Sequence, residues 1–421
     1  MKTIKLFFIL LFISNLVTAQ NVKNYSKLGD KFYQEKNYPS AIENYLLSIK
    51  YTDFKANIGG VYYNIACCQA LQNKTEEAFD YLKKSFKNGY NDKNNLLKDT
   101  DLTILHNDNR WNELVKSVKE DKKALNSDPA KAKFVTNDIH RFWKAYDIVN
   151  KDTTNYKIIF KKEYFDKASP GMNDYMALKV GSINQFISHI KSKPKFYKSI
   201  RNTSLEVDNY KKDFLNSFTK MKNLYPNSKF PDVYFVIGAF TSGGTVSKKG
   251  LLIGLNQACQ TEETNLEEFN FGDKLKLSKQ KNIPSLIAHE LIHFQQDGMK
   301  NDTITLGYAI KEGMADFIGE LISGNGANLE LHKWAKGKEK VIWEKFTKDM
   351  YFDRYNKWLA NYENASETNF PDQGYWIGYQ ICKAYYENTS DKKKAINDML
   401  NIQDYRKFLI DSGWEKKLEL M

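Results

Sequence analysis

Cysteine, proline and arginine are scarce in this 421-residue sequence, and each scarcity excludes a class of protein. Four cysteines are too few for a disulfide framework, and 8 prolines with 22 glycines are too few for a collagen-like or low-complexity chain. The sequence is 42% hydrophobic and 14% aromatic. That is enough apolar surface to build a core, so wholesale disorder is excluded, and the length suits one large or two ordinary domains.

The few cysteines leave two arrangements open. Cys67 and Cys68 are adjacent on an expected helix and cannot easily pair with each other. Cys259 and Cys382 can pair in an oxidising compartment, whereas buried free thiols are the alternative.

The scarcity of arginine bears on the net charge of +12. Only five of the 63 basic residues are arginine, the side chain that most often reads phosphates and base edges, and scattered lysines mainly add solubility. We therefore expect no nucleic-acid partner and at most a weak attraction to an anionic envelope surface.

No apolar run is long enough to span a membrane. The run from Leu6 to Ile13 follows Lys2 and Lys5 and ends near the small residue Ala19, which is typical of a signal peptide over residues 1–19. No cysteine follows the expected cleavage site to carry a lipid. These features predict a periplasmic or secreted protein without a membrane span.

Residues 20–122 resemble a tetratricopeptide array. Gly29 to Ala66 and Ala41 to Ala78 both span 37 residues, close to the period of about 34 of such repeats. A third partial unit begins at Asp99 or Asp101, either of which can cap a helix. The resemblance implies an α-solenoid with a groove for a protein partner; the alternative is a module that only packs against the rest of the chain. Besides those small residues, the repeated positions are Tyr25, Leu28, Phe32, Tyr45 and Ser48, followed by Tyr62, Ile65, Leu82 and Ser85.

A polar linker over residues 123–132 precedes a second domain, 133–421, which contains a metal-binding motif. His289-Glu290-Leu291-Ile292-His293 lies in an apolar pattern that predicts a helix from Asn282 through Phe294. The two histidines are one helical turn apart and can bind one zinc ion, while Glu290 lies beside them and can hold the metal's water.

A second expected helix supplies the third ligand. Glu312 and Asp316 are four residues apart and share a face, and Gly324 is a suitable C-terminal stop. Glu312 can complete the zinc shell while Asp316 hydrogen-bonds a ligand imidazole. The alternative is that both are ordinary solvated helix acids.

This arrangement resembles the gluzincin metallopeptidases, the thermolysin-like clan, and more closely a bacterial family of predicted zinc-dependent proteases. The resemblance implies His289, His293 and Glu312 as ligands of one Zn²⁺ per chain, Asp316 as their support and Glu290 as general base. It rests on those residues and on Tyr225-Pro226, the segments 231–238 and 242–245, and Gly374-Tyr375-Trp376-Ile377-Gly378-Tyr379.

Two further features have open interpretations. The apolar runs 233–239 and 250–256, separated by Gly243-Gly244, suggest a hairpin that either pairs with an extended peptide or belongs to the core. Tyr375 is a candidate catalytic donor to a tetrahedral oxygen, in competition with Tyr379 and His332, although an aromatic helix face is usually core.

Together these observations predict an α+β, mostly helical protein with a small antiparallel or mixed sheet. The predicted function is an exported zinc metallopeptidase acting on a peptide or protein substrate. The rival is a non-catalytic interaction or scaffold protein with a structural or vestigial zinc site.

Overall fold

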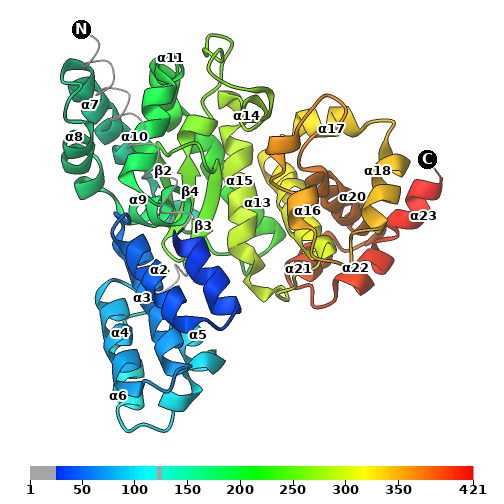
Figure 1. Ribbon diagram of the computed structural model, residues 1–421. Helices are drawn as coiled ribbons and strands as arrows, with labels where there is room; N and C mark the ends of the chain where they lie inside the picture. Colours follow the sequence, from blue (N-terminus) through cyan, green and yellow to red (C-terminus); the bar gives the residue numbers. More distant parts are fainter. Residues whose placement is uncertain (1–24, 121–125, 421) are drawn as a thin grey trace. The chain divides into compact units, whose positions relative to one another are not determined.

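The computed structural model describes residues 25–120 and 126–420, which are mostly helical with one small mixed sheet (Figure 1). The chain divides into two compact units. The first unit contains residues up to Lys122 and Lys144–Ser192, and the second contains Lys123–Trp143 and Lys193–Met421. The predicted signal peptide, 1–19, and the first residues of the predicted linker, 123–125, lie outside the described residues.

The first unit begins with a row of consecutive helices. Residues 25–34 are helical, and α3 (Lys55–Ala70) packs against both α2 (Tyr38–Ile49) and α4 (Thr75–Lys87). The small residues Ala41, Ala66 and Ala78, which define the predicted repeat, are fully buried between these helices. The expected helix pairs are therefore present, whereas their assignment to the tetratricopeptide family stays a prediction.

Of the two residues expected to cap a helix at the end of this row, Asp99 and Asp101, the one that does so is Asp99. Its side chain accepts a hydrogen bond from the Asp101 amide at the start of the 3₁₀ helix Thr100–Leu105. The rest of the row is α5 (Lys93–Lys98) and α6 (Trp111–Ser117), and the unit continues with α8 (Tyr156–Glu163), α9 (Pro170–Tyr175), the π-helix Met176–Val180 and α10 (Ile183–Ser192).

The second unit contains a four-stranded sheet in the order β1-β2-β4-β3. β1 (Phe134–Val135), β2 (Asp232–Val236) and β4 (Gly250–Gly254) are parallel neighbours, and β3 (Gly244–Ser247) runs antiparallel to β4. The sheet is therefore mixed, and the predicted hairpin of residues 233–239 with 250–256 is wrong. Those two runs pair in parallel, and the segment between them forms β3 instead of only a turn.

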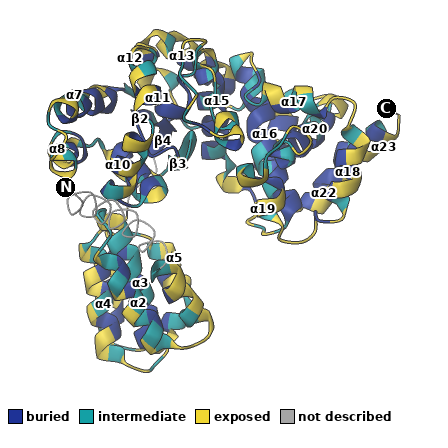
Figure 2. Ribbon diagram, turned by 45° about the horizontal axis from the view of Figure 1, so that its top comes forward, coloured by how far each residue is buried: buried dark blue, intermediate teal, exposed yellow. Residues whose placement is uncertain are grey.

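Three long helices extend from this sheet through the interior of the second unit. α15 (Ile283–Gln295) contacts β3 and β4 on one side and α16 (Thr305–Ser323) on the other, and α16 also packs along α20 (Gln373–Asn388) (Figure 1). Most residues of α15 and α16 are buried (Figure 2). An apolar helix of this kind is stabilised mainly by the packing on all its sides.

The contact between α16 and α20 depends on two glycines. A Cβ atom on Gly378 would lie 1.7 Å from the carbonyl oxygen of Ala309, and one on Gly313 would lie 2.0 Å from the amide nitrogen of Tyr379. The two backbones therefore touch directly, which only glycine permits.

All four cysteines of the chain are buried and free. Cys259 and Cys382 are therefore not a disulfide. Helix α7 (Asn137–Lys151) has residues in both units, since the division falls after Trp143. The remaining helices of the second unit are α11 (Pro194–Ser199), α12 (Arg201–Leu205), α13 (Lys211–Leu224), α14 (Phe271–Leu275), α17 (Leu329–Ala335), α18 (Glu339–Thr347), α19 (Tyr355–Trp358), α21 (Lys392–Leu400), α22 (Tyr405–Ser412) and α23 (Trp414–Glu419).

Candidate metal centre

Helix α15 presents both histidines of the motif. It begins with Ile283 and Pro284, where proline's fixed φ suits a first turn, and it is buried along almost its whole length. His289 and His293 project from the same side because four residues make about one turn. The helix ends at Gln295, within one residue of the predicted end.

Helix α16 presents the two acids to the same place. It ends at Ser323, and Gly324 adopts the left-handed conformation (φ 88°) that closes many helices. Gly319 lets α16 approach α15 closely, because a Cβ there would lie only 3.2 Å from the His289 amide nitrogen. The sequence therefore predicted both helices and the residue that ends the second one.

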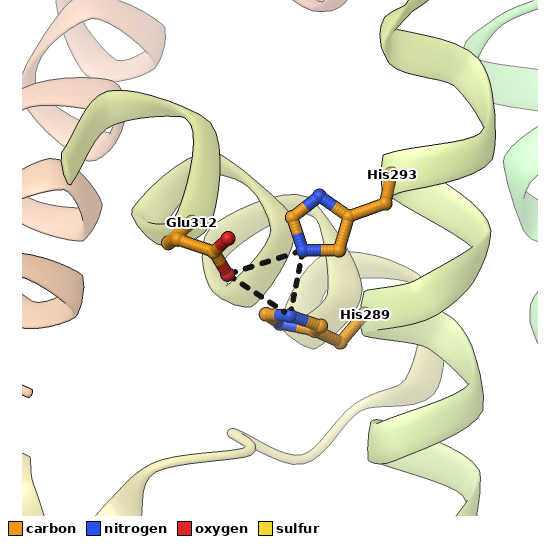
Figure 3. Close-up of side chains that lie close together, drawn as sticks. All are labelled: His289, His293 and Glu312. Carbon is orange, nitrogen blue, oxygen red and sulfur yellow. Dashed lines mark hydrogen bonds and ion pairs between the residues drawn. The ribbon is translucent and has the colours of Figure 1, made fainter. Parts of the chain in front are cut away.

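The side chains of His289, His293 and Glu312 converge on one point (Figure 3). The two imidazole Nε2 atoms are 2.9 Å apart, and Oε2 of Glu312 is 3.1 Å from Nε2 of His293 and 3.6 Å from Nε2 of His289. All three donor atoms lie within 4.8 Å of one another, which is close enough to hold one ion. Two imidazoles and a carboxylate form a ligand set typical of zinc.

Hydrogen bonds at the far side of each imidazole fix which nitrogen faces that point. Nδ1 of His289 is 2.8 Å from Oδ1 of Asp316, and Nδ1 of His293 is 2.8 Å from Oε1 of Gln296. Both oxygens are acceptors, so both Nδ1 atoms carry the hydrogen and both Nε2 atoms of the neutral rings carry a lone pair. Three acceptors thus face one another, and only positive charge between them makes the arrangement favourable.

The pKa values of these groups show how strongly the cluster attracts positive charge. Burial alone lowers the pKa of His289, but hydrogen bonds with Asp316 and Glu312 raise it well above its usual value. Burial also lowers the pKa of His293, but the charge of Glu312 and its hydrogen bond outweigh burial, so this pKa too is raised. For Glu312, burial raises the pKa, but the two histidines bring it well below its usual value. Within the described part of the chain, the only ion-pair partners of Glu312 and Asp316 are these histidines.

The other predicted site residues lie close to the cluster, in different surroundings. Glu290 is buried beneath β3, since a Cβ on Gly244 would lie 2.2 Å from its Oε1. The ring of Tyr375 is stacked on that of His289, with centroids 6.1 Å apart. Tyr379 instead donates its hydroxyl hydrogen to Glu320, and His332 packs against the Tyr379 ring.

A second group of metal-binding residue types lies in the first unit. Cys67, Asp99 and Asp101 also have donor atoms within 4.8 Å of one another. There the carboxylates already accept hydrogen bonds, Asp99 from the Tyr63 hydroxyl and Asp101 from the Tyr33 hydroxyl. We interpret this group as a polar contact between helices.

Sequence reasoning missed Gln296, Asn328 and Asp372. Asn328 donates to Oδ2 of Asp316 at 2.6 Å and so holds the carboxylate that supports His289. Asp372 caps a loop near the site, where it accepts hydrogen bonds from the Ala360 amide and the Tyr362 hydroxyl. Gln296 follows His293 by three residues, a spacing that places it on the same face; nothing in the sequence marks the other two.

Burial raises the pKa of Asp372 to about 6, although its hydrogen bonds with Tyr362 and Ala360 oppose this. The folded state therefore binds a proton more tightly than the unfolded chain, and the free energy of unfolding falls as pH rises from about 4 to about 6. We expect Asp372→Asn to remove this loss, which amounts to roughly 3 kcal/mol above pH 6. Urea unfolding of both proteins between pH 4 and pH 7 tests this, and parallel pH profiles would contradict it.

Comparison with known proteins identifies the family. Residues 119–416, more than two thirds of the chain, match the family model for gliding motility protein GldB. The chain belongs to the GldB family. No curated protein and no solved structure matches it. The match includes the whole candidate metal centre and does not extend to the helices before residue 119.

GldB membership corrects the predicted identity and activity. The resemblance to gluzincin metallopeptidases is wrong as an assignment, because the matching family is one of gliding motility lipoproteins and not of proteases. The predicted hydrolase and its peptide substrate are withdrawn with it. Glu290 and Tyr375 were predicted as participants in that reaction, and the structure describes only their positions.

GldB membership also bears on where the chain works. A lipoprotein family implies the cell envelope, in agreement with the predicted periplasmic side, and a motility family implies protein partners. Among the described residues, no helix has both the length and the apolar character needed to cross a membrane.

Proposed function

We propose that this chain is an envelope component of the gliding apparatus that binds one zinc ion through His289, His293 and Glu312. The family match supports the cellular process, and the facing lone pairs of the two imidazoles and the carboxylate support the ion. The ion offsets the negative charge of buried acids and fixes α15 against α16. Its role is to stabilise the shape of the second unit for binding protein partners.

The partial exposure of the ligands supports a partner-binding role for this region. The side chains of His293 and Glu312 are 17% and 22% exposed, so the ligand cluster is accessible to solvent at one side. A zinc ion with three protein ligands accepts a fourth from water or from another molecule. The helix row of the first unit is a second surface for a partner, with the exposed apolar side chains Leu28 and Leu46.

The test compares two identical substitutions on one helix. Glu312→Gln removes the charged ligand, and we expect a loss of zinc affinity larger than the roughly 10- to 100-fold caused by loss of an outer hydrogen-bond partner. Glu320→Gln, two turns further along α16, keeps an acceptor for the Tyr379 hydroxyl and is expected to leave zinc content unchanged. Zinc is measured by elemental analysis of the purified chains.

The same two variants test the cellular role. In cells whose own gene is deleted, we expect the wild type and Glu320→Gln to restore colony spreading and Glu312→Gln to fail at equal protein level. Normal spreading by a Glu312→Gln protein that lacks zinc would show that the ion has no part in motility. Absence of zinc from the wild-type chain would remove the metal site altogether.

A further inference from the structure

The two ligand imidazoles are supported in chemically different ways. His289 donates to a carboxylate, Asp316, which Asn328 holds from the N-terminus of α17. His293 donates to a neutral amide, Gln296, whose Nε2 donates in turn to the backbone carbonyl of Lys311 at 2.8 Å. Lys311 directly precedes Glu312, so this second chain of bonds joins a ligand on α15 to the backbone beside a ligand on α16.

The amide of Gln296 suits the position between His293 and Lys311 better than a carboxylate does. It must accept a hydrogen from Nδ1 of His293 with one atom and donate one to the Lys311 carbonyl with the other. A carboxylate can accept but cannot donate, and it would turn a second oxygen toward that carbonyl. A carboxylate would also add a negative charge near Glu290, Glu312 and Asp316. The two positive charges of a zinc ion already offset the charge of these three acids only in part.

We propose that Gln296 is a positioning residue that sets the tautomer of His293 and fixes its ring relative to Glu312. This inference rests on the proposed zinc site and names a residue that determines its affinity. Because the support is an amide, His293 keeps its lone pair toward the ion without a further buried charge. The orientation of His293 then depends on one side chain, Gln296, which directly follows α15 and hydrogen-bonds the backbone of α16.

Two nearly isosteric substitutions separate the two functions of the amide. Gln296→Met removes both the acceptor and the donor, and we expect zinc affinity to fall by roughly 10- to 100-fold. Gln296→Glu keeps the acceptor and loses the donor, so we expect a smaller but clear loss, toward the lower end of that roughly 10- to 100-fold range. The affinity is measured by competition with a chelator of known zinc affinity.

The neighbouring Gln295 provides the matched control. Its amide accepts from the Lys229 amide and donates to the carbonyls of Lys229 and Leu291. It therefore joins backbone segments as Gln296 does, but among the described residues its hydrogen-bond partners do not include either histidine. We expect Gln295→Met to lower the stability to urea while the zinc affinity stays at the wild-type value. A merely structural role for Gln296 would instead give both Met variants the same zinc affinity.

Cobalt replacement gives a second readout. Co²⁺ in place of zinc has visible absorption bands that depend on the geometry of its ligands. We expect Gln295→Met to keep the wild-type spectrum and Gln296→Met to change it. If the wild type binds neither ion, the proposed function fails; if the wild type binds zinc and Gln296→Met binds it equally well, only the role of Gln296 is wrong.

Discussion

Removal of zinc by a chelator is expected to lower the free energy of unfolding of the second unit by about 4 kcal/mol when free zinc had stood about 1,000-fold above its dissociation constant. The proposed ion would bind only the folded chain, because His289, His293 and Glu312 converge only when α15 and α16 are packed. Without it, three acceptor atoms face one another in a largely buried place. Protons taken up by the histidines recover part of this loss, since the pKa values of both are raised.

The measurement is urea unfolding of the full chain with added zinc and with chelator. The Glu312→Gln protein is the control, because its curve should be nearly the same in both conditions. An equal effect of chelator on the wild type and on Glu312→Gln would place the responsible ion elsewhere. No effect on either would contradict a stabilising ion at this site.

The other large effect is expected from the glycines between α16 and α20. Gly378→Ala places a methyl group 1.7 Å from the Ala309 carbonyl oxygen, and Gly313→Ala places one 2.0 Å from the Tyr379 amide nitrogen. Backbone atoms cannot rotate away as a side chain does, so the two helices must separate. We expect each variant to lose about 3 kcal/mol of unfolding free energy, the upper range for overpacking.

Gly307→Ala is the control for this pair, because Gly307 is also in α16 but its Cβ would meet only side-chain atoms, the edge of the Tyr405 ring at 3.4 Å and Cβ of Asp302 at 3.5 Å. The gain in helix propensity should keep its stability within about 1 kcal/mol of the wild type. Wild-type stability in Gly378→Ala would show that α20 has room to move. Since Gly313 follows Glu312 directly, the two destabilised variants should also bind zinc less tightly.

Local periodicity was enough to predict the two site helices. The apolar pattern around His289 and His293 predicted α15, and the pattern around Glu312 with Gly324 predicted α16 and its end. These succeeded because the spacing of ligands on a helix is set by the helix itself. The two histidines of α15 and the two acids of α16 can meet because small residues such as Gly319 let the helices approach closely. Those small residues were visible in the sequence.

The topology of the sheet was not accessible in the same way. Two apolar runs with glycines between them look alike whether they pair as a hairpin or lie parallel with a third strand between them. The short β3 has only four residues and begins at Gly244, directly after Ser242-Gly243, so turn-forming residues obscure its start in the sequence. Only the packing of β2 against β4 determines that they are parallel.

The motif alone could not predict the function. Two histidines and a glutamate on adjacent helices specify a ligand set, but the same set serves proteins of different activity, so the residues alone could not distinguish a protease from a motility protein. The supports Gln296 and Asn328 were missed for a related reason. A single Gln or Asn does not produce a periodic pattern in a sequence. Its role in the site depends on the groups that it hydrogen-bonds in the folded chain.

The four free cysteines have a consequence for a chain of the cell envelope. All are buried, and burial raises the pKa of each thiol, so they stay protonated and poor nucleophiles. Oxidants and thiol–disulfide exchange enzymes have little access to them. Once folded, the chain should therefore be equally stable in reducing and oxidising surroundings, since it contains no disulfide to be reduced.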